Sequence, residues 1–233
     1  MTKRSPRGFG QVETWIFDLD NTLYPASCRL FDQIDQRMGQ FIADLLKVDR
    51  IEARRIQKDF FFRHGTTLRG LMVEHSIDPD AFLDFVHDID HSPVPANAAL
   101  AEALEGLPGR KLIFTNGTVA HAQKVMARLG VDDHFHGVFD IVHSDYIPKP
   151  ARRPYEKFIA RHAIDPDRAA MFEDIARNLE VPAALGMTTV LVPDAANVDG
   201  TLINQLNGDA EGAPYVHHVT GDLAAFLAPL VRP

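Results

Sequence analysis

Residues 15–25 read WIFDLDNTLYP, and we expect the rest of the chain to be organised around this stretch. An apolar run that resembles a buried strand ends at Asp18, and a second acid, Asp20, follows two residues later. Asn21 and Thr22 are residues that favour turns, so the chain is predicted to turn directly after the strand. Both carboxylates would then lie at the carboxyl end of a strand, where open α/β sheets bind their ligands.

Composition limits the class of protein. With 233 residues and 45% hydrophobic content, the chain can bury a core for one large domain or for one with a smaller insertion. The net charge is -8 with acids and bases mixed, which argues against a nucleic-acid polymer as partner but does not exclude a small phosphorylated metabolite. The single cysteine, Cys28, fits a cytoplasmic protein, and we expect a monomer or weak dimer. Residues 1–11 lead into no apolar signal region, and no run of about 20 apolar residues predicts a membrane span.

A block of helical pattern interrupts the chain after its first strand. Apolar residues recur at three-to-four spacing, and Asp78 before Pro79 is a typical helix start. About seventy residues pass without a strand, which indicates an inserted unit. The sequence therefore predicts a small all-helical cap over residues 25–95 and an α/β core formed by residues 1–24 and 96–233. The helices expected in the cap are 30–47, 50–64, 67–75 and 79–90.

From residue 96 onward, helical and strand patterns alternate. This alternation is typical of a parallel sheet that is covered by helices on both faces. Residues 197–212 carry little pattern and are predicted to be a surface excursion. The expected strands are 111–115, 138–142, 169–172, 188–192 and 215–219, and the expected helices are 96–106, 119–129, 154–163, 178–185 and one that begins at 222.

Polar side chains follow several of these strands. Parallel strands would deliver them all to one edge of the sheet. Carboxylates from Asp18 and Asp174 plus a backbone carbonyl suit Mg2+, which prefers oxygen ligands. Hydroxyl, amide and N–H groups at the start of a helix suit phosphate oxygens, and a lysine would add positive charge. The segments are Asp18 with Asp20, then Thr115, Asn116 and Gly117, then Lys149, and finally Glu173 with Asp174.

Four of these pieces together resemble the four motifs of the haloacid dehalogenase superfamily, in the same order. They are FDLDNTLYP (17–25), FTNGT (114–118), KP (149–150) and FED (172–174) with Asn178 close behind. Within the superfamily, the chain looks most like the pyrimidine 5'-nucleotidase group, through DLDNTLYP, HGTTLRGLM (64–72), TNGTVAHAQKVMARLG (115–130) and Tyr155 after KP. The resemblance implies a Rossmann-like core with the cap inserted just after the first motif.

The resemblance also implies roles for individual residues. Asp18 would be the nucleophile that forms an aspartyl-phosphate, and Asp20 the general acid and base whose backbone carbonyl binds Mg2+. Thr115 and Lys149 would hold the transferring phosphoryl oxygens. Asp174 would bind the metal directly and Glu173 through a water. The expected activity is thus Mg2+-dependent hydrolysis of phosphomonoesters, with pyrimidine nucleoside 5'-monophosphates as the leading substrates.

Several alternatives remain open at this level. The substrate could be a sugar phosphate or phosphoglycolate, the reaction could be that of a phosphomutase, or the chain could be a non-catalytic relative that binds a ligand or partner. Glu173 could reach the metal, a water or Lys149, and Asn178 could cap a helix or orient Asp174. Loop 64–69 could be a plain turn with a helix cap, or Thr66, Thr67 and Arg69 could contact a nucleoside. The eleven histidines show no metal-binding spacing and are expected at the surface.

Overall fold

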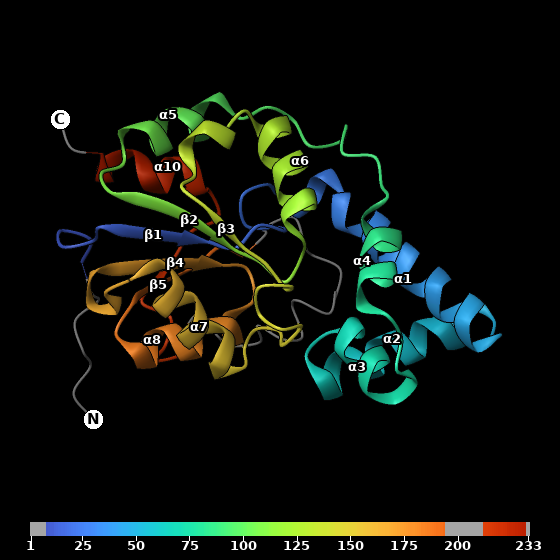
Figure 1. Cartoon of the computed structure of the whole chain (residues 1–233). Helices are drawn as coiled ribbons and strands as arrows, with labels where there is room; N and C mark the ends of the chain where they lie inside the picture. The colour runs from blue at the N-terminus through green and yellow to red at the C-terminus, as the bar shows by residue number, and fades with distance from the viewer. Residues whose placement is uncertain (1–7, 194–211, 232–233) are drawn as a thin grey trace.

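A parallel β-sheet forms the centre of the fold in a computed structural model of the chain, which describes residues 8–193 and 212–231. Within these residues the strand order is β3-β2-β1-β4-β5-β6, and every neighbouring pair is parallel. The expected α/β fold is therefore confirmed, with β1 between β2 and β4 (Figure 1). The strands are β1 (Thr14–Phe17), β2 (Arg110–Phe114), β3 (Val138–Phe139), β4 (Ala169–Glu173), β5 (Thr188–Leu191) and β6 (His218–Val219).

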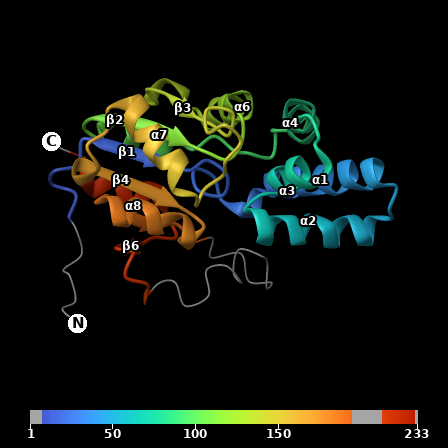
Figure 2. The same cartoon turned by 60° about the horizontal axis from the view of Figure 1, so that its bottom comes forward.

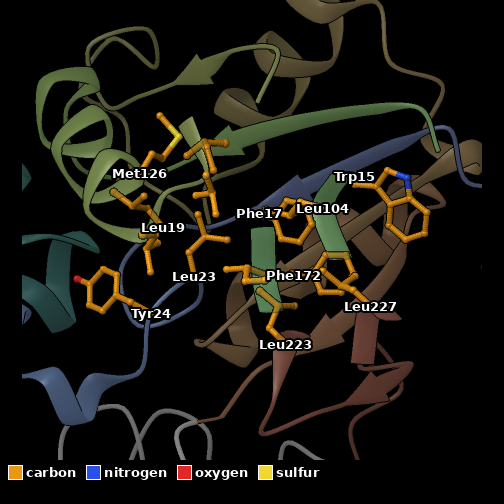
Figure 3. Packing of buried hydrophobic residues seen from close by; sticks show 14 of the residues in the cluster. Trp15, Phe17, Leu19, Leu23, Tyr24, Leu104, Met126, Phe172, Leu223 and Leu227 are labelled. Atoms are coloured by element: carbon orange, nitrogen blue, oxygen red, sulfur yellow. The ribbon is translucent and has the colours of Figure 1, made fainter. Parts of the chain in front are cut away.

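Helices cover both faces of the sheet because the strands are apolar on both sides. Trp15 and Phe17 pack into one cluster with α5, α6 and α10, whereas Ile16 points the other way and packs with Phe158 of α7. Figure 3 shows the first cluster, with Trp15 at one end and Tyr24 at the other. The helices of this layer structure are α5 (Ala98–Gly106), α6 (Val119–Leu129), α7 (Arg152–His162), α8 (Glu180–Leu185) and α10 (Leu223–Leu227).

Four consecutive helices form a separate group beside the sheet (Figures 1 and 2). They are α1 (Leu30–Leu46), α2 (Arg50–His64), α3 (Thr67–His75) and α4 (Pro79–His87), close to the ranges expected. We call them the four-helix group. Their apolar faces make one cluster that includes Phe60 and Leu71, and Ile141 from the core joins it. The division into two domains at residues 24/25 and 95/96 stays a prediction.

Several boundaries differ from the expected ones, and the strand expected over 215–219, for example, is limited to His218–Val219. The strand expected over 138–142 ends at Phe139, because the carboxylate of Asp140 accepts from the backbone N–H groups of Val119 and His143 and the chain turns there. The helix expected over 79–90 ends at His87. The helix expected over 178–185 begins as a 3-10 turn at 176–179.

Residues 1–7 and nearly all of the expected surface excursion at 197–212 lie outside the described residues. Among the helices that are described, none combines the length and apolar character needed to cross a membrane.

Candidate active site

The chain turns directly after β1, at the edge of the sheet where the motifs were expected to meet. The backbone N–H of Asp18 donates to the carbonyl of Phe172 at 2.9 Å, so the strand pairing continues to this residue. Asn21 then adopts a φ of 59°, a left-handed conformation that asparagine tolerates better than most residues. The turn expected after Asp18 is therefore present, and Asp20 lies within it.

Lys149 lies at the centre of the site. Its Nζ is 2.7 Å from Oδ1 of Asp18, 2.6 Å from Oε1 of Glu173 and 2.9 Å from the backbone carbonyl of Phe114. Its side chain is only 1% exposed. Burial alone would lower the pKa of Lys149, but the charges of Asp18 and Glu173 outweigh burial and raise the pKa, so the ammonium stays charged.

Glu173 is held by donors on both of its carboxylate oxygens. Oε1 accepts from Lys149 and, at 2.8 Å, from the side-chain amide of Asn178, while Oε2 accepts from the backbone N–H of Ile175 at 3.0 Å. The backbone carbonyl of Asn178 in turn accepts from the hydroxyl of Tyr155 at 2.8 Å. Neither role considered for Asn178, as a helix cap or as a support for Asp174, includes this contact with Glu173.

Asp18, Glu173 and Asp174 form a buried cluster of acids whose candidate ligand oxygens all lie within 4.8 Å of one another. Burial, followed by the charge of Glu173, raises the pKa of Asp18 to about 7, although Lys149 opposes this. Burial and the charges of Glu173 and Asp18 raise the pKa of Asp174 well above its ordinary value. Three acids so close together need more positive charge than one ammonium supplies, and oxygen clusters of this kind suit a hard divalent cation.

The segment after β2 lies close to both Lys149 and Asp20. The side-chain oxygen of Asn116 accepts from the backbone N–H of Lys149 at 3.0 Å, and the hydroxyl of Thr115 accepts from the N–H of Gly117 at 2.8 Å. A Cβ at Gly117 would lie 3.7 Å from Oδ2 of Asp20. The three residues thus lie between the lysine and the second acid.

Asp20 has partners quite different from those of Asp18. Its Oδ1 lies 2.5 Å from the hydroxyl of Tyr24 and 2.8 Å from Nε2 of His121. Burial would raise the pKa of Asp20, but His121 and then Tyr24 outweigh burial, and the pKa is lowered. Two acids two residues apart are therefore held in different electrostatic environments.

The expectation that the histidines lie at the surface is wrong for His121 and His91, which are 1% and 9% exposed. The sequence carried a signal for His121, since positions 121, 125 and 129 fall on one face of α6 and both Val125 and Leu129 are buried. Tyr24 follows Asp20 by four residues within the turn. What the sequence lacked was any sign that these two side chains meet at one carboxyl oxygen.

Loop 64–69 contacts the core beside Lys149. A Cβ on Gly65 would lie 3.2 Å from Cγ of Pro148. Thr66 caps α3 by accepting from the N–H of Arg69, and the hydroxyl of Thr67 lies 3.5 Å from the carbonyl of Gln57 inside the four-helix group. Within the described residues, the guanidinium of Arg69 has no hydrogen-bond or ion-pair partner. The loop therefore has the turn and cap of the simpler alternative and also lies against the site.

Arg152 and Arg153, which follow the lysine motif, form exposed pairs with Glu156 and Asp145. They belong to the surface.

Comparison with known proteins agrees with this geometry. Residues 12–186 match the family model of haloacid dehalogenase-like hydrolases, and the chain belongs to this family. It is 26% identical over 196 residues to phosphate metabolism protein 8 of Saccharomyces cerevisiae, a match that covers 77% of this chain but only 61% of that protein.

Solved structures show the same fold at low identity. The L-2-haloacid dehalogenase of Xanthobacter autotrophicus is 15% identical, with a TM-score of 0.57 over 93% of this chain and 97% of that one. A β-phosphoglucomutase candidate from Thermotoga maritima is 17% identical, also with a TM-score of 0.57, over 94% and 98%. These likenesses establish the haloacid dehalogenase-like fold.

Proposed function

We propose that the chain is a Mg2+-dependent phosphomonoesterase that works through an aspartyl-phosphate on Asp18. The observation that carries this proposal is the different treatment of two neighbouring acids. Asp18 faces a buried ammonium at 2.7 Å, whereas Asp20 faces a histidine and a tyrosine hydroxyl. A nucleophilic carboxylate and a proton-transferring carboxyl need separate environments of this kind.

In the first step, a carboxylate oxygen of Asp18 attacks phosphorus and the bond from phosphorus to the ester oxygen breaks. Asp20 gives its proton to the departing alkoxide. In the second step, Asp20 removes a proton from a water molecule, whose oxygen attacks phosphorus and frees Asp18 and inorganic phosphate. A bound phosphate dianion would raise the pKa of Asp20 by charge repulsion, which favours the protonated form that the first step requires.

The cation that we propose is Mg2+, which the carboxylates of Asp18 and Asp174 and the backbone carbonyl of Asp20 would hold. When bound, it supplies positive charge to the phosphoryl oxygens and keeps neighbouring carboxylates ionised. In this proposal Glu173 binds Lys149 and is not a metal ligand, because both of its carboxylate oxygens already accept hydrogen bonds. Lys149, Thr115 and the backbone N–H groups near Gly117 would hold the phosphoryl oxygens.

The presence of Asp20 favours a phosphate ester over a halogenated acid as substrate, even though dehalogenases share the fold. Halide leaves as a stable anion and needs no proton. An alkoxide leaving group does need one, and in this proposal Asp20 would supply it. The similarity to a protein named for phosphate metabolism supports the same choice.

For the substrate itself we propose nucleoside 5'-monophosphates, pyrimidine ones first. The support is the likeness of HGTTLRGLM to the nucleotidase group and the position of loop 64–69 beside Pro148. The four-helix group would act as a cap over the site, which would exclude water until the leaving group departs. Arg69, which lacks a partner within the described residues, is the candidate contact to the nucleoside.

A substrate panel tests the proposal. UMP, CMP, AMP, a sugar phosphate, phosphoglycolate and p-nitrophenyl phosphate are assayed for phosphate release with Mg2+ and with EDTA. We expect hydrolysis that needs Mg2+, the highest kcat/KM for UMP and CMP, and no turnover in a folded Asp18→Asn variant. Unchanged turnover in Asp18→Asn would refute the nucleophile, and transfer of phosphate to a second hydroxyl would indicate a phosphomutase.

The nucleotide part of the proposal has its own test. Arg69→Met should lower kcat/KM for UMP by about 10-fold while p-nitrophenyl phosphate changes little, since only the nucleotide offers the guanidinium a partner. Arg55→Met is the matched control, because Arg55 lies in the same four-helix group and, among the described residues, pairs only with Glu52 at the surface. If UMP and CMP are no better than the other esters, the nucleotide assignment fails and the phosphatase assignment stands.

A further inference from the structure

Three histidines meet beside Asp20, where the four-helix group joins the core. His121 belongs to α6, His87 ends α4, and His91 lies in the segment that returns to α5. Nδ1 of His121 is 3.0 Å from Nε2 of His91, and the ring of His87 stacks on His121 with centroids 4.8 Å apart. The His121 side chain is 0% exposed. Its ring is therefore fixed in place from both sides.

The direction of the hydrogen bonds between these histidines follows from the contact that His91 makes with the backbone. Nδ1 of His91 lies 3.2 Å from the carbonyl of Ile89, which can only accept, so this nitrogen carries the hydrogen. A neutral His91 then accepts at Nε2 from Nδ1–H of His121. The 2.8 Å contact between His121 and Asp20 needs one further hydrogen, on Nε2 or on Oδ1, and is a hydrogen bond in either case.

The two oxygens of Asp20 are consequently unequal. Oδ1 is held by His121 and by the hydroxyl of Tyr24. Oδ2 lies toward Gly117, and within the described residues it has no hydrogen-bond partner. These two hydrogen bonds fix the rotation of the carboxyl group, so that Oδ2 faces the side on which Gly117 lies.

We infer that His121, supported by His91 and assisted by Tyr24, is a positioning residue that holds Oδ1 of Asp20 so that Oδ2 transfers the proton. This inference rests on the proposed function. Because His87 and His91 belong to the four-helix group and its return segment, the support of Asp20 would also depend on how that group sits on the core. His121 itself touches no reacting atom in this assignment.

The test compares esters whose leaving groups differ in their need for a proton. A nucleotide loses a basic alkoxide, whereas p-nitrophenyl phosphate loses a stable phenolate. In His121→Asn, whose amide reaches His91 but not Asp20, we expect kcat/KM for the nucleotide to fall about 100-fold and that for p-nitrophenyl phosphate to change less than about threefold. His121→Gln, which restores a donor toward Asp20, should recover most of the loss.

Two controls separate positioning from a general loss of structure. His75→Asn on the exposed part of α3 should behave as the parent protein. Tyr24→Phe removes the hydroxyl that donates to Oδ1 of Asp20 with almost no change in volume, and it should show the same dependence on leaving group. This variant provides the same test if His121→Asn does not fold. A uniform loss on both esters, or no recovery in His121→Gln, would overturn the inference. No hydrolysis of any phosphomonoester by the unmodified protein would instead refute the proposed function.

Discussion

Nζ of Lys149 lies 2.7 Å from Oδ1 of Asp18, and the two side chains are 1% and 11% exposed. The pair joins a loop after β3 to the end of β1, and the two residues lie 131 positions apart in the sequence. Because the contact is buried, neither charge can exchange its partner for water at low cost. The stability of the site therefore depends on this pair as much as its chemistry does.

Replacing Lys149 should destabilise the whole core. Lys149→Met keeps most of the side-chain volume but leaves Asp18 and Glu173 without their common cation, and we expect a loss of about 3–5 kcal/mol in the free energy of unfolding in EDTA. Lys157→Met is the matched control, because Lys157 forms an exposed pair with Asp145, and its replacement should cost about 0–1 kcal/mol. Urea unfolding measures the free energy of unfolding of both variants. Equal losses would contradict the claim that the buried pairs of Lys149 stabilise the protein more than an exposed pair does.

Replacements of Glu173 and Asp174, the two acids of the fourth motif, should affect different properties of the protein. Asp174→Asn should abolish the rise in Tm that Mg2+ causes in the parent protein, because a proposed ligand is lost. Glu173→Gln should keep more of that rise yet lower kcat by about 10-fold or more, because Glu173 holds Lys149 in place. Thermal unfolding across a Mg2+ titration measures the first effect and phosphate release the second. A stronger loss of Mg2+ response in Glu173→Gln would reverse the assignment.

The raised pKa of Asp18 predicts that stability depends on pH in the absence of metal. In the folded protein this pKa is about 7, so between about pH 4 and 7 the folded state holds a proton that the unfolded state has released. The stabilisation is present below about pH 4 and is lost as pH rises toward 7, by at most about 4 kcal/mol.

Asp18→Asn should lack this decline, since the amide does not titrate. The measurement is the free energy of unfolding of both proteins in EDTA from pH 5 to pH 8, with the difference between them as the readout. A difference that stays constant with pH would show that the pKa of Asp18 is not raised.

Packing within the four-helix group gives two predictions of opposite sign. A Cβ at Gly70 would lie 2.4 Å from Cγ of Phe60, so Gly70→Ala should cost about 1–3 kcal/mol. Gly39 lies within α1, and the nearest atom to its added Cβ is Oε1 of Gln57 at 3.5 Å. Gly39→Ala should therefore stabilise by about 0.5–1 kcal/mol. Denaturant unfolding of both variants measures these changes. A stabilised Gly70→Ala would show that the packing between Gly70 and Phe60 is looser than described.

The sequence alone predicted how the site assembles from distant segments. Asp18 directly follows β1 and Glu173 ends β4, and strand ends in a parallel sheet meet at one edge. The helix bounds Arg50–His64 and Thr67–His75 agree with the ranges expected from apolar spacing, and in the structure Asp49 and Thr66 cap these two helices.

The contacts of individual side chains could not be predicted in the same way. The partner of His121 depends on where the turn after β1 and the return segment at His91 pass α6, and no local pattern records that geometry. Glu173 could have faced a metal or a lysine with equal reason, until its two donors from the 175–178 turn were located. The short β3 depended on the capping role of Asp140, which periodicity does not show.

The most direct test of the account is a search for the covalent intermediate. The protein is mixed with Mg2+ and a phosphomonoester that it hydrolyses, quenched in acid within the first turnover, digested and analysed by mass spectrometry. The account predicts one additional phosphoryl group on the peptide that carries Asp18, labile to base and absent from Asp18→Asn. Full hydrolytic activity with no phosphoryl group on that peptide, or with the group on another residue, would contradict it.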